Sequence, residues 1–330
     1  MSKKRIAING FGRIGRLTFR NLMKNDQVEV VAINDLTDNH TLAHLLKYDT
    51  MHGRFEGTVT ADDEYLHING KKILGCAIKN PAELPWKSLN VDVVLECTGI
   101  FLDREKAGLH LQAGAKRVVL SAPPKADDVP TFVIGANHEQ IKDTDLILSN
   151  ASCTTNCLVP MIMTLDKAFG VEQFFMNTIH AYTADQNLQD GPHRDLRRAR
   201  AAAQNIVPTS TGAAKAVVLV APHLKGKIAA HSMRVPVATG SVTDVVATIR
   251  TAASVEQINA AFKAAAESNL RGILEYTEDP IVSGDIVRNT HSCIFDSGLT
   301  QVNGNTCRIV GWYDNEAGYS ARLADLAAMV

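Results

Sequence analysis

The spacing of apolar residues changes character near residue 150. Residues 4–9 alternate poorly but are rich in Ile and bounded by glycine, which is typical of a buried parallel strand. The next segment spaces Leu17, Phe19 and Leu22 as a helix would, and residues 28–35 read as a second strand. Further strands are predicted at residues 92–99, 117–123, 131–137 and 146–150, with a helix between the first two. This alternation favours an open parallel sheet flanked by helices.

Beyond residue 150 the predicted elements are longer strands with few helices between them. A helix is expected at about 153–168, followed by strands at 171–183, 226–237, 240–250, 292–296 and 306–313. This pattern favours a mostly antiparallel sheet. Ser254 and Gln257 form a capping box before an amphipathic stretch, so that helix should cover the sheet. The last residues, from about 316, read as a further amphipathic helix.

Composition narrows the class of protein. The 330 residues suit roughly two domains, and 45% hydrophobic content supports a full core. A formal net charge of -1 offers no basic field for nucleic acid or a membrane surface. No apolar run approaches the roughly 20 residues that cross a bilayer. Asn9 and Gly10 interrupt the first apolar run too early for a signal peptide, so the six cysteines are expected to be reduced in a cytoplasmic protein.

A glycine pattern follows the first strand. Gly10, Gly12 and Gly15 fit G-x-G-x-x-G, and Asp35 ends the second strand 20 positions after the last glycine. Alone, the glycines could serve a structural turn and Asp35 could be an ordinary turn acid. Placed between a strand and a helix, they predict a dinucleotide site with the phosphates at the helix N-terminus. Asp35 would bind the adenine ribose and repel a 2′-phosphate, which favours NAD over NADP.

The stretch SNASCTTNC, residues 149–157, raises four alternatives for its two cysteines. Zinc needs about four ligands, and no second Cys or His pair lies close in the sequence, so no metal is expected. A disulfide needs an oxidising compartment. Buried packing suits Cys157, which is expected in the apolar turn CLVP. Cys153 follows a strand and opens a helix, whose N-terminus favours a thiolate and lowers its pKa, as a nucleophile requires.

A neighbouring imidazole would activate Cys153 further. Eleven histidines are present, and sequence alone does not decide which one serves. His180 is the best candidate, because it lies on an interior-looking strand among polar residues in NTIHAYT. We therefore predict a pair of Cys153 and His180.

Five segments together resemble the phosphorylating glyceraldehyde-3-phosphate dehydrogenases: INGFGRIGR, ASCTTNC, DGPHRDLRRARAAAQNIVPTSTGAAKAV, RVP and WYDNEAGYS. The resemblance runs from about Lys4 to the C-terminal helix. It implies an N-terminal Rossmann NAD-binding domain (1–151), an α+β catalytic domain (152–315), and a helix (316–330) that packs back onto the first. It also implies a cytoplasmic homotetramer that uses NAD and phosphate in glycolysis and gluconeogenesis. The product, 1,3-bisphosphoglycerate, would form through a thioester on Cys153.

The resemblance also assigns residues, with Cys153 as the nucleophile and His180 as its base. It places around the cofactor Gly10, Phe11, Gly12, Arg13, Ile14, Gly15, Asp35, Lys79, Thr98, Gly99, Ser121, Asn315 and Tyr319. It places near the substrate phosphate Thr183, Asp185 and Arg234, and near the attacking phosphate Ser152, Thr154, Arg198, Thr211 and Gly212. Arg197 remains an alternative to Arg198.

Some positions depart from the family pattern, and three rival functions are considered. Lys79 stands where many relatives carry Arg, and Met51 and Ala317 also differ; each could alter cofactor packing or a subunit contact. Leu36 and Pro192 match the NAD-using members, whereas NADP users tend to have small polar residues there. The nearest rival is erythrose-4-phosphate dehydrogenase, which uses water as acyl acceptor. A cysteine hydrolase would have no use for the glycine pattern, and a secondary binding role has no support from charge.

Overall fold

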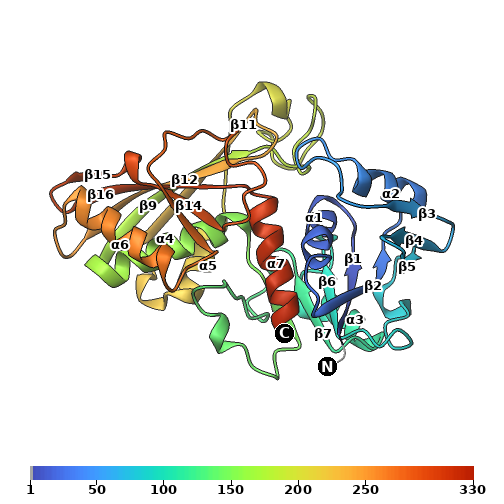
Figure 1. Cartoon of the computed structure of the whole chain (residues 1–330). Coiled ribbons are helices and arrows are strands. Elements are labelled where there is room, and N and C mark those ends of the chain that lie inside the picture. The colour runs from blue at the N-terminus through green and yellow to red at the C-terminus, as the bar shows by residue number, and fades with distance from the viewer. Residues whose placement is uncertain (1–2) are drawn as a thin grey trace. The chain divides into compact units, whose positions relative to one another are not determined.

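The computed structural model describes residues 3–330 as two compact units. The first unit comprises residues 3–132, 140–151 and 320–330, and the second comprises 133–139 and 152–319. Figure 1 follows the chain through both units from blue to red. Within the described residues, no helix combines the length and apolarity needed to cross a membrane.

The first unit is built on a sheet with the strand order β3-β4-β5-β2-β1-β6-β7-β8. Its strands are β1 (Lys4–Asn9), β2 (Val28–Asn34), β3 (Val59–Ala61), β4 (Tyr65–Ile68), β5 (Lys71–Cys76), β6 (Val93–Glu96), β7 (Arg117–Leu120) and β8 (Ile147–Ser149). Across the sheet, the pairings along β5-β2-β1-β6-β7-β8 are all parallel. The β3–β4 and β4–β5 pairings are antiparallel. The predicted parallel sheet is thus confirmed, with an antiparallel extension at one edge.

Helices connect the parallel strands of this sheet. They are α1 (Arg13–Leu22), α2 (Asn39–Lys47) and α3 (Arg104–Gln112), with a short 3₁₀ turn at Pro81–Glu83. A further 3₁₀ turn, His138–Gln140, begins in the residues of the second unit. The central strands are buried on both faces: Ile6, Ala7 and Ile8 have no exposed surface. The end of α7 (Ala317–Met329) also belongs to this unit, where Lys4 Nζ donates to the Ala328 carbonyl at 2.7 Å.

The second unit holds a mostly antiparallel sheet, as predicted. The strand order is β10-β11-β9-β12-β16-β14-β13, with β15 paired to β16. Its strands are β9 (Val171–Ala181), β10 (Val207–Thr209), β11 (Ile228–Val235), β12 (Ser241–Ile249), β13 (Leu274–Thr277), β14 (Cys293–Asp296), β15 (Gln301–Asn303) and β16 (Thr306–Tyr313). Only the β9–β11 and β13–β14 pairs are parallel.

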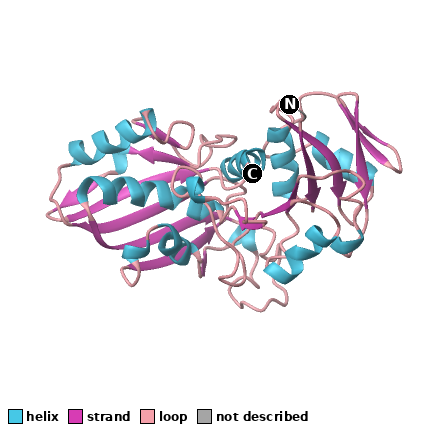
Figure 2. Cartoon of the chain, turned by 90° about the horizontal axis from the view of Figure 1, so that it is seen from below, coloured by secondary structure: helices cyan, strands magenta, loops and turns pink. Residues whose placement is uncertain are grey.

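Helices α4 (Cys153–Phe169), α5 (Ala213–Val220) and α6 (Val255–Glu267) pack on one face of this sheet. Figure 2 shows the helices of this unit, in cyan, lying along one side of its strands. The predicted capping box forms between Ser254 and Gln257. Phe262 of α6 stacks on Phe295 of β14 with ring centroids 3.9 Å apart. On the opposite face, Phe175 stays 65% exposed.

Two sequence expectations need correction. Residues 131–137 do not form a strand; only Thr131 makes an isolated bridge, and the chain then turns. The Asn137 side chain accepts a hydrogen bond from the Val133 N–H at 2.8 Å, and Gly135 has a φ of +87°, so the local polar chemistry favours a turn over a ladder. Cys157 is buried as expected, but it lies inside α4, which continues past Pro160.

Candidate functional site

The glycine loop of the first unit has the geometry that its sequence requires. Gly10 has a φ of +93°, and a Cβ there would lie 2.7 Å from the Thr98 nitrogen. A Cβ at Gly15 would lie 2.2 Å from the Gly10 carbonyl oxygen, so helix and strand approach too closely for any side chain. By contrast, a Cβ at Gly12 meets no atom within 4 Å. The backbone at Gly12 is therefore open to a ligand.

Asp35 is fixed by backbone donors on both of its oxygens. The Phe11 N–H donates to Oδ2 at 2.8 Å, and the Thr37 N–H donates to Oδ1 at 3.0 Å. The carboxylate at the end of β2 is thereby tied to the glycine loop that follows β1. A carboxylate oxygen has more than one acceptor position, so both oxygens remain able to accept ribose hydroxyls.

A cavity of about 490 Å³ opens beside Asp35 at the carboxyl ends of the parallel strands. Crevices at this edge of a doubly wound sheet are where such folds bind dinucleotides. All lining residues come from the first unit: Asn9, Gly10, Gly12, Asn34, Asp35, Leu36, Ile78, Lys79, Cys97, Thr98, Ile100 and Phe101. Helix α1 begins here, and its N-cap, Gly12, provides no side-chain cap. The helix start and the open glycine backbone fit the pyrophosphate of a dinucleotide.

Several expected cofactor residues lie outside the lining of this cavity. Ser121 lies just after β7, where its N–H donates to the Glu96 carbonyl at 3.0 Å. The Arg13 side chain turns to Asp49, with which it forms an ion pair, and to His52. Phe11 is 1% exposed and packs edge-on against Phe19. These residues shape the loop rather than the cavity surface.

Asn9, Asn34 and Ile78 line the cavity but were missed by sequence reasoning. A signal for the two asparagines exists, because each is the polar last residue of its strand and directly follows a run of apolar residues. Such a residue at the carboxyl end of a parallel strand points to the edge where ligands bind. Ile78 carries no comparable signal.

In the second unit, Cys153 is the first residue of α4. Ser152 is the N-cap, and its Oγ accepts from the Thr155 N–H at 3.1 Å. Thr154 is buried, and its hydroxyl hydrogen bonds to the Tyr313 hydroxyl at 2.9 Å. Cys153 itself stays partly exposed, at the positive end of a 17-residue helix.

His180 lies near the end of β9 with Nε2 3.4 Å from the Cys153 Sγ. Its Nδ1 is 2.7 Å from the Ala181 carbonyl oxygen. A carbonyl only accepts, so Nδ1 carries the proton and Nε2 presents its lone pair to the thiol. The Tyr313 ring meets the imidazole edge-on at 5.8 Å. The predicted partners are therefore neighbours, with the tautomer that a base requires.

The pKa of Cys153 differs in direction from the sequence expectation. Burial raises the pKa of this thiol, although the Arg234 charge and hydrogen bonds at the helix start act to lower it. Burial, helped by the Arg234 charge, lowers the pKa of His180 to about 4. The neutral thiol and neutral imidazole are consequently the favoured resting pair. The helix N-terminus, usually 0.3–1 kcal/mol, does not outweigh the desolvation of a thiolate.

Arg234 stands beside this pair. It lies on β11 in register with His180, and its Nη1 donates to Thr183 Oγ1 at 2.6 Å. The Arg234 Nε is buried and finds no hydrogen-bond partner among the described residues. Such a buried, unsatisfied N–H is costly unless an acceptor arrives, so it marks this guanidinium as a place for an anion.

Thr183, Asp185 and Arg198 form a cluster next to Arg234. Asp185 bonds to the Thr183 hydroxyl and pairs with Arg198. Burial acts to raise the pKa of Asp185, but the Thr183 hydrogen bond and the neighbouring guanidinium groups bring it below its usual range. Arg198 also donates to Thr209 Oγ1 through Nη2 at 2.7 Å. Arg197, in contrast, is exposed, so the structure brings Arg198 rather than Arg197 into the cluster.

The remaining predicted residues lie at element ends of the second unit. Thr211 and Gly212 precede α5, and Gly212 is its N-cap without a side-chain cap. Asn315 is buried, and its Oδ1 accepts from the Gly240 N–H at 3.1 Å and from Ser241 Oγ at 3.0 Å. These bonds fix the oxygen side of the amide. Tyr319 is 4% exposed on α7.

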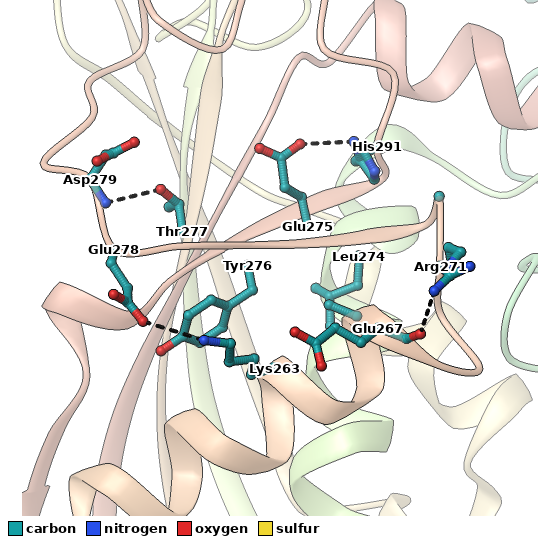
Figure 3. A pocket seen from close by; sticks show the side chains of 12 residues that line it. Lys263, Glu267, Arg271, Leu274, Glu275, Tyr276, Thr277, Glu278, Asp279 and His291 are labelled. Atoms are coloured by element: carbon teal, nitrogen blue, oxygen red, sulfur yellow. Dashed lines mark hydrogen bonds and ion pairs between the residues drawn. The ribbon is translucent and has the colours of Figure 1, made fainter.

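Another cavity in the second unit, of about 520 Å³, lies between β13 and α6 (Figure 3). Its charged groups bind one another: Lys263 approaches Glu278, and His291 approaches Glu275 at 2.9 Å. We assign it no ligand. Residues 3–330 contain no group of three or more side chains suited to a metal ion, and the six cysteines are free.

The parallel sheet, the glycine loop and the cavity beside Asp35 define a dinucleotide-binding protein. Comparisons with known proteins specify which one. The family model described as the NAD binding domain of glyceraldehyde 3-phosphate dehydrogenase matches residues 4–104, and the model for its C-terminal domain matches residues 152–315. The chain belongs to the glyceraldehyde-3-phosphate dehydrogenase family.

Curated relatives agree over nearly the whole chain. A glyceraldehyde-3-phosphate dehydrogenase of Mycobacterium avium is 57% identical over 99% of this chain and 98% of its own length. The protein of the same name from Mycolicibacterium smegmatis is 56% identical with the same coverage. Glyceraldehyde-3-phosphate dehydrogenase 2 of Streptomyces avermitilis is 53% identical, again over 99% and 98%. The predicted family, NAD as cofactor and oxidoreductase activity are thus confirmed.

Proposed function

We propose that this enzyme oxidises D-glyceraldehyde 3-phosphate to 1,3-bisphosphoglycerate through a thioester on Cys153. The observation that carries the proposal is the 3.4 Å approach of His180 Nε2 to Cys153 Sγ, with Nδ1 held by the Ala181 carbonyl. A nucleophile next to an oriented base is the arrangement that covalent catalysis requires.

In the first step His180 takes the thiol proton at Nε2 as Sγ attacks the aldehyde carbon. A C–S bond forms, and the carbonyl oxygen becomes an alkoxide that takes up the proton as a hemithioacetal. The Cys153 N–H, at the start of α4, is suited to stabilise negative charge on that oxygen. When bound, NAD accepts the hydride that the substrate carbon gives up. His180 removes the hydroxyl proton, which leaves a thioester.

The second step needs an acyl acceptor. Inorganic phosphate attacks the thioester carbon, the C–S bond breaks, and the thiolate leaves as the acyl phosphate forms. We assign the substrate phosphate to Arg234 and Thr183, because Arg234 keeps a buried N–H without a partner. We assign the attacking phosphate to Arg198, Thr211 and Gly212, with Ser152 and Thr154 completing that region through their place at the α4 start.

We assign the cofactor to the residues that the sequence predicts for it. Asp35 would bind the adenine ribose, and the Gly10–Gly15 loop would bind the pyrophosphate. Lys79, Leu36 and Thr98 line the same cavity. Asn315 would hold the nicotinamide amide through its Nδ2, because its Oδ1 is already engaged. The domain roles follow: residues 1–151 for NAD, 152–315 for catalysis, and the helix at 316–330 packed on the first.

We further propose a cytoplasmic homotetramer. Phe175 of β9 pairs in register with Val246 of β12, and they are 65% and 42% exposed on the uncovered face of the second sheet. Adjacent exposed apolar side chains on such a face favour burial against another subunit. Light scattering after size exclusion tests this: the mass should be four times 35.7 kDa. A monomer would contradict it.

The acyl acceptor is tested by NADH formation from glyceraldehyde 3-phosphate with and without phosphate. Steady turnover should depend strongly on phosphate, or on arsenate in its place. Equal turnover in phosphate-free buffer would instead support water as acceptor, as in erythrose-4-phosphate dehydrogenase. Comparing the two aldehydes under both conditions separates these functions.

A further inference from the structure

A chain of buried hydrogen bonds lies beneath the cavity of the first unit, and no step of the proposed mechanism uses it. Its centre is Glu96, the last residue of β6, with 0% exposure. Oε2 accepts from Asn9 Nδ2 at 2.6 Å and from His110 Nε2 at 3.0 Å. Oε1 accepts from the Thr98 N–H at 2.8 Å and from the Thr98 hydroxyl. Four donors converge on one carboxylate.

His110 is held in one tautomer by Trp86. The indole Nε1 is a donor only, and it lies 3.0 Å from His110 Nδ1. Nδ1 therefore carries no proton, and Nε2 carries the one donated to Glu96. Both His110 and Trp86 are 0% exposed, so no water replaces these bonds. These bonds therefore fix both the tautomer and the orientation of the His110 ring.

The other end reaches two more segments. Asn9 Oδ1 accepts from Asn34 Nδ2 at 2.7 Å. Asn34 in turn binds both backbone groups of Ile78, each at 2.9 Å. These side-chain bonds thus join the ends of β1, β2 and β6 and the loop after β5. They add to the backbone pairing, which runs to the last residue of each of these strands.

In each of the joined segments, the residue that follows the hydrogen-bonded one in the chain lines the cavity. Asn9 precedes Gly10, Asn34 precedes Asp35, and Ile78 precedes Lys79, while Thr98 lines the cavity directly. Glu96 does not line it. A change at Glu96 would therefore reach a bound ligand only through the positions of these loops.

We propose that Glu96 is a positioning residue whose buried carboxylate, through Asn9 and Thr98, sets the shape of the NAD cavity and hence the affinity for NAD. The proposal rests on the placement of NAD in that cavity under the proposed function. This role requires that both side-chain oxygens of Glu96 accept hydrogen bonds. Glutamine at this position would direct an NH₂ group either at the Asn9 and His110 donors or at the Thr98 donors, and one pair must lose its partner.

The test is the Glu96→Gln variant of the full-length enzyme, titrated with NAD and with ADP-ribose by calorimetry. ADP-ribose lacks the nicotinamide, so it reports on the cavity of the first unit alone. We expect both dissociation constants to rise by about tenfold or more, because a buried donor is left unpaired. At saturating NAD, kcat should stay within about threefold of wild type, since Glu96 does not touch the reacting groups.

Asp296→Asn is the matched control. Asp296 is likewise a buried carboxylate. It accepts a hydrogen bond from the Trp312 indole Nε1 at 3.0 Å, and it lies in the second unit. The Asp296→Asn variant should leave the dissociation constants for NAD and ADP-ribose unchanged, even if it lowers the free energy of unfolding. Unchanged affinities in a folded Glu96→Gln enzyme, or an equal change in the control, would overturn the proposal.

The Asp35→Ala variant distinguishes an error in the role of Glu96 from an error in the placement of NAD in this cavity. If Asp35→Ala weakens ADP-ribose binding and Glu96→Gln does not, the role of Glu96 is wrong and the placement stands. If neither weakens it, the placement itself is wrong.

If Glu96→Gln does not fold, a pair of variants at His110 carries the test. Glutamine offers a carbonyl to Trp86 and an N–H to Glu96, whereas leucine offers neither. His110→Leu should weaken ADP-ribose binding several-fold more than His110→Gln. Equal affinities in the two variants would overturn the proposal, because packing alone would then explain the effect.

Discussion

His180 Nε2 lies 3.4 Å from Cys153 Sγ, although the two residues are 27 positions apart in the chain. The pairing arises because α4 begins and β9 ends at the same end of the second sheet. The Ala181 carbonyl holds the proton on Nδ1, so Nε2 is available as a base. Its pKa of about 4 keeps the imidazole neutral throughout the physiological range.

Replacing His180 by asparagine should remove the base while keeping a donor toward the Ala181 carbonyl. We expect kcat to fall by about 100-fold or more, the usual scale for losing a general base. Stopped-flow measurement of NADH formation in the first turnover checks this. His223→Asn, an exposed histidine of the same unit paired with Asp166, is the control and should leave the rate unchanged. A normal first turnover in His180→Asn would assign the base to another residue.

The lowered pKa of His180 also predicts an acid-dependent loss of stability. Below its ordinary pKa of 6.5 the unfolded chain binds a proton that the folded chain, with a pKa of about 4, does not bind. This contribution is absent above pH 6.5 and destabilises the fold as pH falls toward 4. By pH 4.5 it should reach about 2–3 kcal/mol.

Urea unfolding of the wild type and His180→Asn at pH 7 and pH 4.5 measures that contribution as a difference. The wild type should lose about 2–3 kcal/mol more than the variant between the two pH values. Equal losses in the two proteins would show that the imidazole is not buried in its neutral form.

Arg234 should tune both members of the pair in the same direction. Its charge lowers the pKa of Cys153 and of His180, so Arg234→Met should raise both. Alkylation of the free enzyme by iodoacetamide, a neutral reagent, should then begin at higher pH. Arg250→Met, which removes an exposed arginine of the same unit, should leave the profile in place. A downward shift in Arg234→Met would contradict the electrostatic account.

Cofactor choice should depend on Asp35. Its carboxylate would repel the 2′-phosphate of NADP, and Leu36 beside it offers that group no donor. We expect kcat/KM to favour NAD by at least about tenfold, which requires only about 1.4 kcal/mol. Asp35→Gly should lower the ratio of kcat/KM for NAD to kcat/KM for NADP. An unchanged ratio would mean that Asp35 does not contact the ribose.

Much of the fold was predictable because its elements carry local signals. The β1–α1–β2 unit followed from an apolar run, a glycine pattern and an acid at fixed spacing, and the Ser254 cap followed from its sequence. The β3–β5 strands were missed, although Asn69–Gly70 is a hairpin signal; both residues have positive φ in the turn between β4 and β5. These strands contain many polar and charged residues, so the alternation of apolar and polar positions that predicts a strand was not recognised.

The contact between Cys153 and His180 was predictable from the sequence, but the pKa shifts of the two side chains were not. Cys153 could be identified from its position at a helix start, and His180 from its polar neighbours. The direction of the Cys153 pKa could not be predicted, because burial is a property of the packed structure. The bonds around Glu96 were not predictable either, since Asn9, Glu96 and His110 are far apart in the chain and join only when the sheet forms.

The most direct test of the central claim is mass spectrometry of the enzyme after one turnover without phosphate. With NAD and glyceraldehyde 3-phosphate, the peptide containing Cys153 should gain one 3-phosphoglyceroyl group, and adding phosphate should remove it. Because that peptide also contains Cys157, the Cys153→Ser and Cys157→Ser variants are compared. The group should be absent from the first variant and present in the second. An acyl group that persists in Cys153→Ser, or none in the wild type, would contradict the thioester mechanism.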